Sequence, residues 1–146
     1  MNILYTNIDN KINQYYFNTE QQCYEKVQEL KCRWYKIYKE SDARSNYFES
    51  SFEWDYEKND LKVNIEKAKE IKRNEYRILR PALFEKLDVK FMKALETNNQ
   101  VKIQEIVELK EKLRNITNLE LPNTEAELFN FYPDCITEAV VYLSQN

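Results

Sequence analysis

Glycine and histidine are both absent from this sequence of 146 residues, which also contains only three prolines and three cysteines. Phosphate-cradling loops of the Walker or dinucleotide-binding type need glycine where the backbone approaches the ligand, so such sites are not expected. Histidine is the usual general base and the commonest metal ligand, and its absence argues against many catalytic and metal sites. We therefore expect no catalytic residue, no metal site and no cofactor.

The absence of glycine also restricts how the chain can turn. A turn that needs a positive φ must use Asn or Asp, which tolerate that conformation better than other residues with a side chain. These two residue types occur in adjacent pairs at 9–10, 59–60 and 98–99. We expect a turn at each of these places.

The three cysteines are Cys23, Cys32 and Cys135. Their number is odd and their spacing does not match a metal site, so we interpret them as buried thiols in a reducing compartment. No apolar run approaches the roughly 18 residues of a membrane span, and the N-terminus has no signal-peptide pattern. These features predict synthesis in the cytoplasm and no association with a membrane.

The bulk composition favours a folded protein with an acidic balance. The hydrophobic fraction is 42 %, the aromatic fraction 14 % and the net charge −3, with a pI near 5.2. This much apolar material makes disorder unexpected, and the length suits one domain or two small lobes. Because a sequence-independent nucleic-acid binder needs a basic face, nucleic acid is not the expected partner.

The N-terminal part has the alternating pattern of a small sheet. Residues 1–17 predict a β-hairpin, and Thr19 with Gln22 predicts a capping box at the start of a helix. A polar stretch at 40–50 is expected to be a loop. Further alternation predicts strands at 33–38, 52–56 and 61–65, the last two forming a hairpin.

The C-terminal part has helical periodicity. Asn64 is a predicted N-cap, and Pro81 predicts a kink or short break near residues 78–80. A turn at 97–100 separates two apolar stripes, which can bury each other only as an antiparallel hairpin. The stripes are Phe84, Leu87, Phe91, Met92 and Leu95, then Ile103, Ile106, Leu109, Leu113 and Ile116. Thr124 and Glu127 predict a capping box on a short helix that Pro133 ends, and the tail beyond favours helix over strand.

Several charged residues are candidates for a functional site. Asp88 lies within an apolar stripe, and the favoured interpretation is an ion pair or cap with a nearby Arg or Lys, such as Arg80 or Arg114. Lys69, Arg73, Arg77 and Arg80 could line one helix face that meets phosphate or an acidic partner. Interrupting glutamates favour instead a solvent-facing helix with salt bridges.

The N-terminal part contains more large rings than so small a sheet would be expected to bury. Exposed aromatic patches mark protein-binding surfaces, so these rings form either an interface or core packing. The predicted interface residues are Tyr15, Tyr16, Phe17, Trp34, Tyr47, Phe48, Phe52 and Trp54.

A series of motifs in fixed order covers residues 52–133. The pattern is a "FxxxWEWD"-like strand, then "KAxEIxRxxxRxxRxPxxxxLDVxFMxALE", then "KxxLRxIT" and "TxxEL…xxP". The matching residues are Phe52, Trp54, Asp55, Lys67, Ala68, Glu70, Ile71, Arg73, Arg77, Arg80, Pro81, Leu87, Asp88, Val89, Phe91, Met92, Ala94, Leu95, Glu96, Lys110, Leu113, Arg114, Ile116, Thr117, Thr124, Glu127, Leu128 and Pro133. This series resembles a family of small proteins encoded near tail and tail-fibre genes of tailed bacteriophages and prophages. The chain departs from it by lacking glycine in the first hairpin and by a longer tail after Pro133.

The resemblance implies a phage structural or accessory protein without enzymatic activity. We expect an α+β fold: a small antiparallel, aromatic-rich sheet with one helix, then a Pro-kinked antiparallel helical hairpin and a short C-terminal helix. The expected lobes are residues 1–63 and 64–146, unless they form one continuous domain. The expected function is a tail- or tail-fibre-associated virion component that binds other phage structural proteins, with self-association left open. The alternatives are a fibre-assembly chaperone absent from the virion and an inhibitor of a host protein.

Overall fold

The computed structural model describes residues 1–42 and 46–145. It confirms an α+β protein, in which a small antiparallel sheet with a helix is followed by a long helix and further helices. The chain divides into two compact units, Met1–Ala68 and Lys69–Asn146. The boundary predicted between residues 63 and 64 lies five residues before this division.

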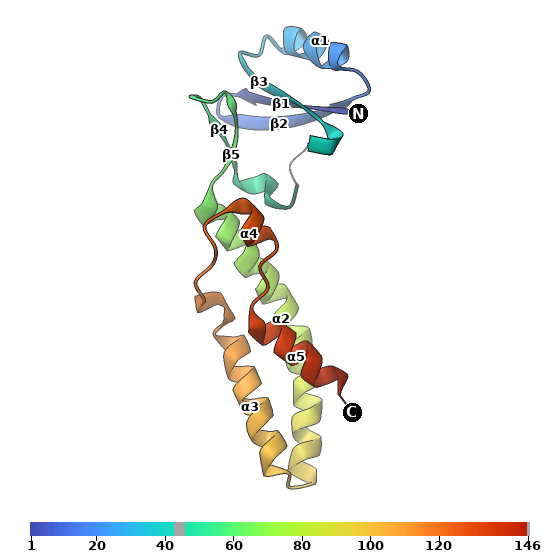
Figure 1. The fold of residues 1–146 in the computed structure, drawn as a ribbon, viewed down its shortest axis with the longest axis vertical. Helices are drawn as coiled ribbons and strands as arrows, with labels where there is room; N and C mark the ends of the chain where they lie inside the picture. The colour runs from blue at the N-terminus through green and yellow to red at the C-terminus, as the bar shows by residue number, and fades with distance from the viewer. Residues whose placement is uncertain (43–45, 146) are drawn as a thin grey trace. The chain divides into compact units, whose positions relative to one another are not determined.

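The first unit is built on a three-stranded antiparallel sheet, which Figure 1 shows beside the chain end marked N. Its strands are β1 (Asn2–Ile8), β2 (Lys11–Phe17) and β3 (Trp34–Lys39), in the order β2-β1-β3. The hairpin predicted for residues 1–17 is confirmed by the pairing of β1 with β2. Because β1 is central, its residues 3–7 are buried.

A helix covers one face of the sheet. Helix α1 (Glu20–Leu30) begins with the predicted capping box, in which Thr19 accepts from the Gln22 amide and the Gln22 side chain accepts from the Thr19 amide. Its buried residues pack against the side of β1 that carries Leu4, and Figure 1 shows α1 on one side of the sheet. The resulting cluster contains Leu4, Cys23, Val27 and Cys32.

A second hairpin covers the opposite face. It consists of β4 (Phe52–Asp55) and β5 (Asp60–Val63), close to the predicted strands. Alternation along β1 places Ile3 and Tyr5 on this side, where they form a core with Trp54 and Leu61. The first unit is therefore three layers thick, with apolar clusters on both faces of one sheet.

The polar stretch at 40–50 is more regular than the predicted loop. It contains two short 3-10 helices, η1 (Glu40–Asp42) and η2 (Asn46–Ser51). Residues 43–45 of this prediction lie outside the described part of the chain. Phe48 and Ser51 of η2 are buried, which anchors the segment to the first unit.

The expectation that only Asn and Asp adopt positive φ is wrong at one position. Asp9, Asn10, Asn59 and Asn98 follow it, but Lys31 has φ 52°. Lys31 ends α1: its amide donates to the Gln28 carbonyl, and the next amide donates to Val27. This is the paired bonding of a Schellman motif, whose left-handed position glycine usually occupies. Because the sequence has no glycine, a lysine adopts the left-handed conformation at this position.

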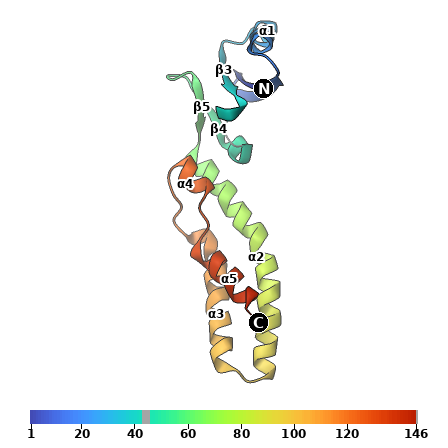
Figure 2. The ribbon, with the colours of Figure 1, turned by 45° about the vertical axis from the view of Figure 1, so that its right-hand side comes forward.

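Helix α2 (Ile65–Glu96) runs for 32 residues and includes Pro81. The predicted N-cap is confirmed, since the Asn64 side chain accepts from the Lys67 amide. The alternative of a break near residues 78–80 is wrong, because the helix is continuous in Figures 1 and 2. Pro81 is exposed, so water can reach the carbonyl that it leaves without an amide partner.

Helix α3 (Gln100–Arg114) returns antiparallel to α2, which confirms the predicted helical hairpin. The buried contacts are made by Leu87 and Ala94 of α2 and by Ile106, Leu109 and Leu113 of α3. The predicted stripe was wrong at Met92 and Leu95, which are exposed. Successive residues of an α-helix are about 100° apart around its axis. When residues 87 and 94 face the core, residues 92 and 95 therefore point away from it.

The C-terminal segment adds η3 (Ile116–Asn118), α4 (Glu125–Phe129) and α5 (Asp134–Ser144). Thr124 caps α4 by accepting from the Glu127 amide, which is one of the two hydrogen bonds of the predicted capping box. Pro133 does not end this helix, which closes at Asn130; it stands at the start of α5. The helical interpretation of the tail is confirmed, and α5 packs along α3. None of the described helices is long and apolar enough to cross a membrane.

Candidate functional site

The predicted aromatic interface is used mainly as core of the first unit. Trp54 is 6 % exposed, Phe48 is fully buried, and both are therefore wrong as surface residues. The half-buried Tyr15 and Phe17 pack against the cluster under α1. Of the eight predicted residues, Tyr16 is exposed, at 50 %.

Two of the remaining predicted rings lie at the other face of the sheet. Trp34 and Phe52 pack against the core that holds Trp54. Tyr47 is half-buried and meets Phe48 edge to face, with ring centroids 4.7 Å apart. Three layers have two apolar interfaces between them, whereas two layers have one, and this is how the small sheet accommodates so many rings.

The predicted structural residues lie on the second unit. Asp88 forms the predicted ion pair with a nearby base, which is Lys110 of α3 and neither of the two arginines named as examples. Arg114 pairs with Glu111 at 3.0 Å, and its guanidinium lies 5.9 Å from the ring centroid of Phe84. Arg80 donates to the main-chain carbonyl of Arg114 instead. Asp88 and Arg114 therefore both stabilise the hairpin, through separate contacts.

The basic run on α2 is salt-bridged, as the favoured interpretation predicted. Glu70 accepts from Arg77 at 2.7 Å and from Arg73 at 3.4 Å. The hydrogen bond from Arg77 is the main reason that the pKa of the Glu70 carboxyl is lowered. Lys69 donates to the side chain of Asn123 at 2.7 Å. With these cations engaged, the face does not form a free phosphate site.

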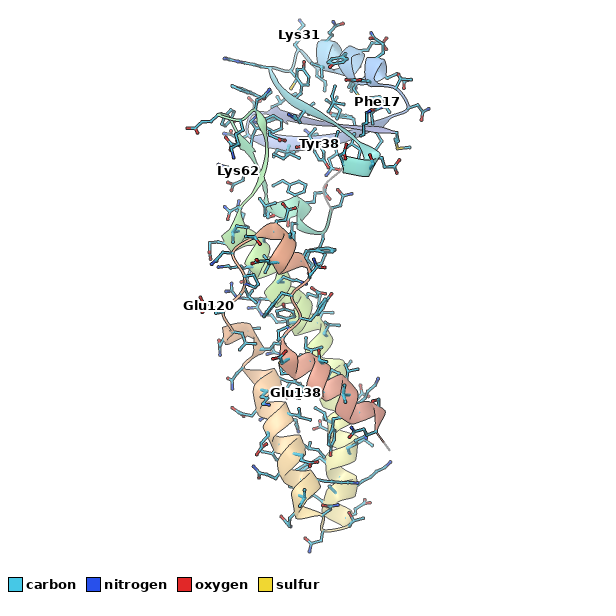
Figure 3. All side chains as sticks on the ribbon, viewed as in Figure 1. Phe17, Lys31, Tyr38, Lys62, Glu120 and Glu138 are labelled. Carbon is cyan, nitrogen blue, oxygen red and sulfur yellow. The ribbon has the colours of Figure 1, made fainter. Side chains whose placement is uncertain are left out.

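A surface hollow on the second unit was not predicted from the sequence. It is a groove of about 790 Å³ between α3, the segment after η3 and the start of α5. We call it the acidic groove. Apolar side chains supply part of its lining: Leu119, Phe131, Tyr132 and Pro133. Its charged lining residues are Glu108, Glu111, Glu120, Asp134 and Glu138, with Lys112 as the one cation. Figure 3 labels Glu120 and Glu138, which come from two of these elements.

Some of these charges are paired within the groove. Lys112 contacts Glu138 at 2.8 Å, and this hydrogen bond raises the pKa of the lysine. Glu111 is held by Arg114. Glu120 and Asp134 make no ion pair with any residue that the structure describes, which leaves negative charge available at the surface. Burial raises the pKa of the Cys135 thiol, so this residue is not an activated nucleophile.

One wall of the groove is fixed by a buried lysine. Lys72 of α2 is 1 % exposed and contacts Glu75 at 3.1 Å. Its ammonium lies 4.4 Å from the ring centroid of Tyr132, and the Tyr132 hydroxyl donates to Glu75 at 3.1 Å. A charged amine enclosed between a carboxylate and an aromatic face is well compensated. The cluster thus holds Tyr132 against α2.

A hydrogen bond from the neighbouring turn of α2 strengthens this attachment. The Tyr76 hydroxyl donates to the Phe131 carbonyl at 3.0 Å. Burial, followed by the charge of Glu75, raises the pKa of Tyr76 to about 12. The spacing of Ala68, Lys72 and Tyr76, four residues apart, was the signal that could have identified the lysine as buried.

A second hollow, of about 540 Å³, lies near the other end of α5. Its lining has the opposite charge balance, with three lysines, Lys90, Lys93 and Lys102, and one glutamate, Glu105. Lys90 donates to the main-chain carbonyls of Tyr142 and Gln145. Lys93 and Lys102 are exposed and make no ion pair within the described residues.

Among the described residues, no group of three or more Cys, Asp or Glu side chains is placed to hold a metal ion. Comparisons with protein-family models, with curated proteins and with solved structures gave no match. The arrangement is best suited to contact with another macromolecule, because a large apolar groove with a charged border has the composition of a protein-binding surface.

Proposed function

We propose that this chain is a non-enzymatic, protein-binding component of a bacteriophage tail or tail fibre. The resemblance over residues 52–133 supports the phage context. The observation that carries the binding role is the acidic groove of about 790 Å³, with apolar residues in its lining and carboxylates around them. Such a surface gives a partner both apolar burial and electrostatic orientation.

Exposed apolar side chains support binding through the second unit. Among the described residues, five large apolar side chains are exposed in the first unit and twelve in the second. Isolated exposed residues are ordinary, but a concentration of them favours a contact surface. The proposed interface is accordingly on the helical unit and not on the aromatic sheet.

The test is mass spectrometry of purified particles from the phage or induced prophage that encodes the chain. We expect the protein at a fixed ratio to tail proteins. Leu119→Lys, which places a charge in the apolar lining, should reduce incorporation at least about tenfold. Met92→Lys is the matched control, since Met92 is similarly exposed but lies outside the groove. It should be incorporated normally.

Other outcomes identify the alternatives. Absence from particles together with capture of a free tail or fibre protein would establish an assembly chaperone. Capture of a host protein alone would establish an inhibitor. Either result would overturn the proposal of a virion component. Equal loss with both variants would show that incorporation does not use the groove.

A further inference from the structure

The second unit carries two surfaces of opposite charge that cannot meet within one chain. The acidic groove has five carboxylates and one lysine in its lining, a balance of −4. The hollow near the far end of α5 has three lysines and one glutamate, a balance of +2. Different residues of helix α5 (Asp134–Ser144) line the two hollows: Asp134, Cys135 and Glu138 line the acidic groove, and Tyr142 and Leu143 line the hollow near the other end.

The basic surface is on a projecting part of the unit. Lys93 and Lys102 flank the turn between α2 and α3, which forms one end of the helical hairpin in Figures 1 and 2. Val101, beside Lys102, is 69 % exposed, and Leu95 is also exposed. We call Lys93, Leu95, Val101 and Lys102 the hairpin tip. It combines apolar side chains with unpaired cations.

The hairpin tip and the acidic groove are complementary in charge and in apolar character. The acidic groove supplies apolar lining for Leu95 and Val101, and its carboxylates match Lys93 and Lys102. We propose that the hairpin tip of one copy docks in the acidic groove of a second copy. Because the two surfaces differ, the contact is heterologous, and it repeats from copy to copy as a ring or an open chain.

The contact depends on charges that are free in a single copy. Lys93 and Lys102 make no ion pair with described residues of their own chain, and the same holds for Glu120 and Asp134. Pairing between copies therefore breaks no intramolecular salt bridge among the described residues. Exposed pairs of this kind are weakened by salt, so association is expected to be strongest at low ionic strength.

The test is sedimentation velocity of the full chain over a concentration series, at about 50 mM and about 500 mM salt. We expect dimers and larger species that increase with concentration at low salt and dissociate at high salt. A groove variant, Glu108→Lys with Glu120→Lys, and a tip variant, Lys93→Glu with Lys102→Glu, should each weaken association about tenfold or more. Circular dichroism checks that each variant keeps its helices.

Mixing the two variants gives the sharpest result. The groove variant retains an intact tip and the tip variant retains an intact groove, so a mixture should form a complex of two chains and nothing larger. Glu25→Lys with Glu85→Lys is the control, because it changes the net charge as much as the groove variant at exposed sites outside the groove. This control should associate at least as well as the unaltered chain.

Three outcomes would overturn the inference. One is a chain that stays monomeric at low salt over the whole series, and another is a symmetric dimer that neither variant weakens. The third is a mixture that fails to form the two-chain complex although both variants are folded. A charge-reversal variant that misfolds is replaced by its neutral counterpart. These are Glu108→Gln with Glu120→Gln for the groove, and Lys93→Gln with Lys102→Gln for the tip. Purified protein alone is used, so failure here is distinct from failure to enter particles.

Discussion

The two units of this protein use their apolar side chains in opposite ways. The first unit encloses most of its rings between three layers, and Trp54, Phe48 and Tyr5 are all buried there. The second unit is a long helical hairpin with added short helices, and twelve of its large apolar side chains are exposed. The comparison shows that aromatic content does not predict which side chains are exposed, because a third layer buries rings that a two-layer sheet would have exposed.

The largest expected effect tests the first half of this comparison. Trp54→Ala removes a 6 %-exposed ring from the core and should reduce the free energy of unfolding by about 3–5 kcal/mol. Tyr16→Ala, at an exposed strand position, should change it by less than about 0.5 kcal/mol. Denaturant titrations of both variants provide the measurement. Similar small losses for both would mean that these aromatic residues are not core.

The next effect concerns the long helix of the second unit. Pro81 is exposed within a continuous helix, and proline costs about 3 kcal/mol relative to alanine in a helix interior. Pro81→Ala should therefore raise the melting temperature, with a gain of up to about 3 kcal/mol. Glu85→Ala, one turn further on, should change stability by only a few tenths of a kcal/mol. A Pro81→Ala protein as stable as the original would contradict the prediction.

A smaller effect depends on pH. The folded-state pKa of Tyr76 is raised to about 12, above its ordinary value of 10, so the neutral phenol stabilises the fold. This contribution is complete below pH 10 and is lost as the pH rises from about 10 to about 12. Tyr76→Phe should cost about 1 kcal/mol near neutrality, through the bond to the Phe131 carbonyl, and should show a shallower loss of stability above pH 10.

The control for this experiment is the pH dependence of the unaltered chain. Tyr24, Tyr132 and Tyr142 also have raised pKa values and contribute to its alkaline destabilisation. The difference between the two stability curves isolates Tyr76. If the curves were parallel from pH 9 to about 12, the buried phenol would have no role in the pH dependence.

The smallest effect compares the left-handed positions of the two units. Lys31 ends α1 with φ 52°, and Asn98 follows α2 with φ 52°. Lys31→Gly should stabilise the first unit by about 1 kcal/mol, because a β-carbon is costly in this conformation. Asn98→Gly should gain less, since Asn tolerates the region better. Thermal melts of the two variants test the order, and a larger gain at Asn98 would reverse it.

Local signals in the sequence predicted most of the fold. The Asp9-Asn10 turn, the capping box of Thr19 and the cap at Asn64 depend on neighbouring residues, so the hairpin and the helix starts could be predicted. The helical hairpin followed from two apolar stripes joined by a short turn. Lys31 could not be predicted, because its conformation is imposed by the end of α1 and not by its own preference.

The candidate site could not be predicted in the same way. The acidic groove joins Glu108, Glu120 and Glu138, which come from three separate segments, and no spacing in the sequence connects them. The aromatic interface was misjudged because the sequence did not show that the second hairpin covers the sheet. The burial of Lys72 could have been inferred from its four-residue spacing from Ala68 and Tyr76, although lysine is ordinarily a surface residue.

The buried position of Lys72 also has a practical consequence for amine chemistry. Acylating reagents modify lysines that water can reach, whereas Lys72 is 1 % exposed behind Glu75 and the Tyr132 ring. Modification of Lys72 therefore requires local opening of the segment that carries Tyr132. Because the rate of such a reaction follows the population of the opened form, Lys72 is an internal reporter of how often this wall of the groove detaches from α2.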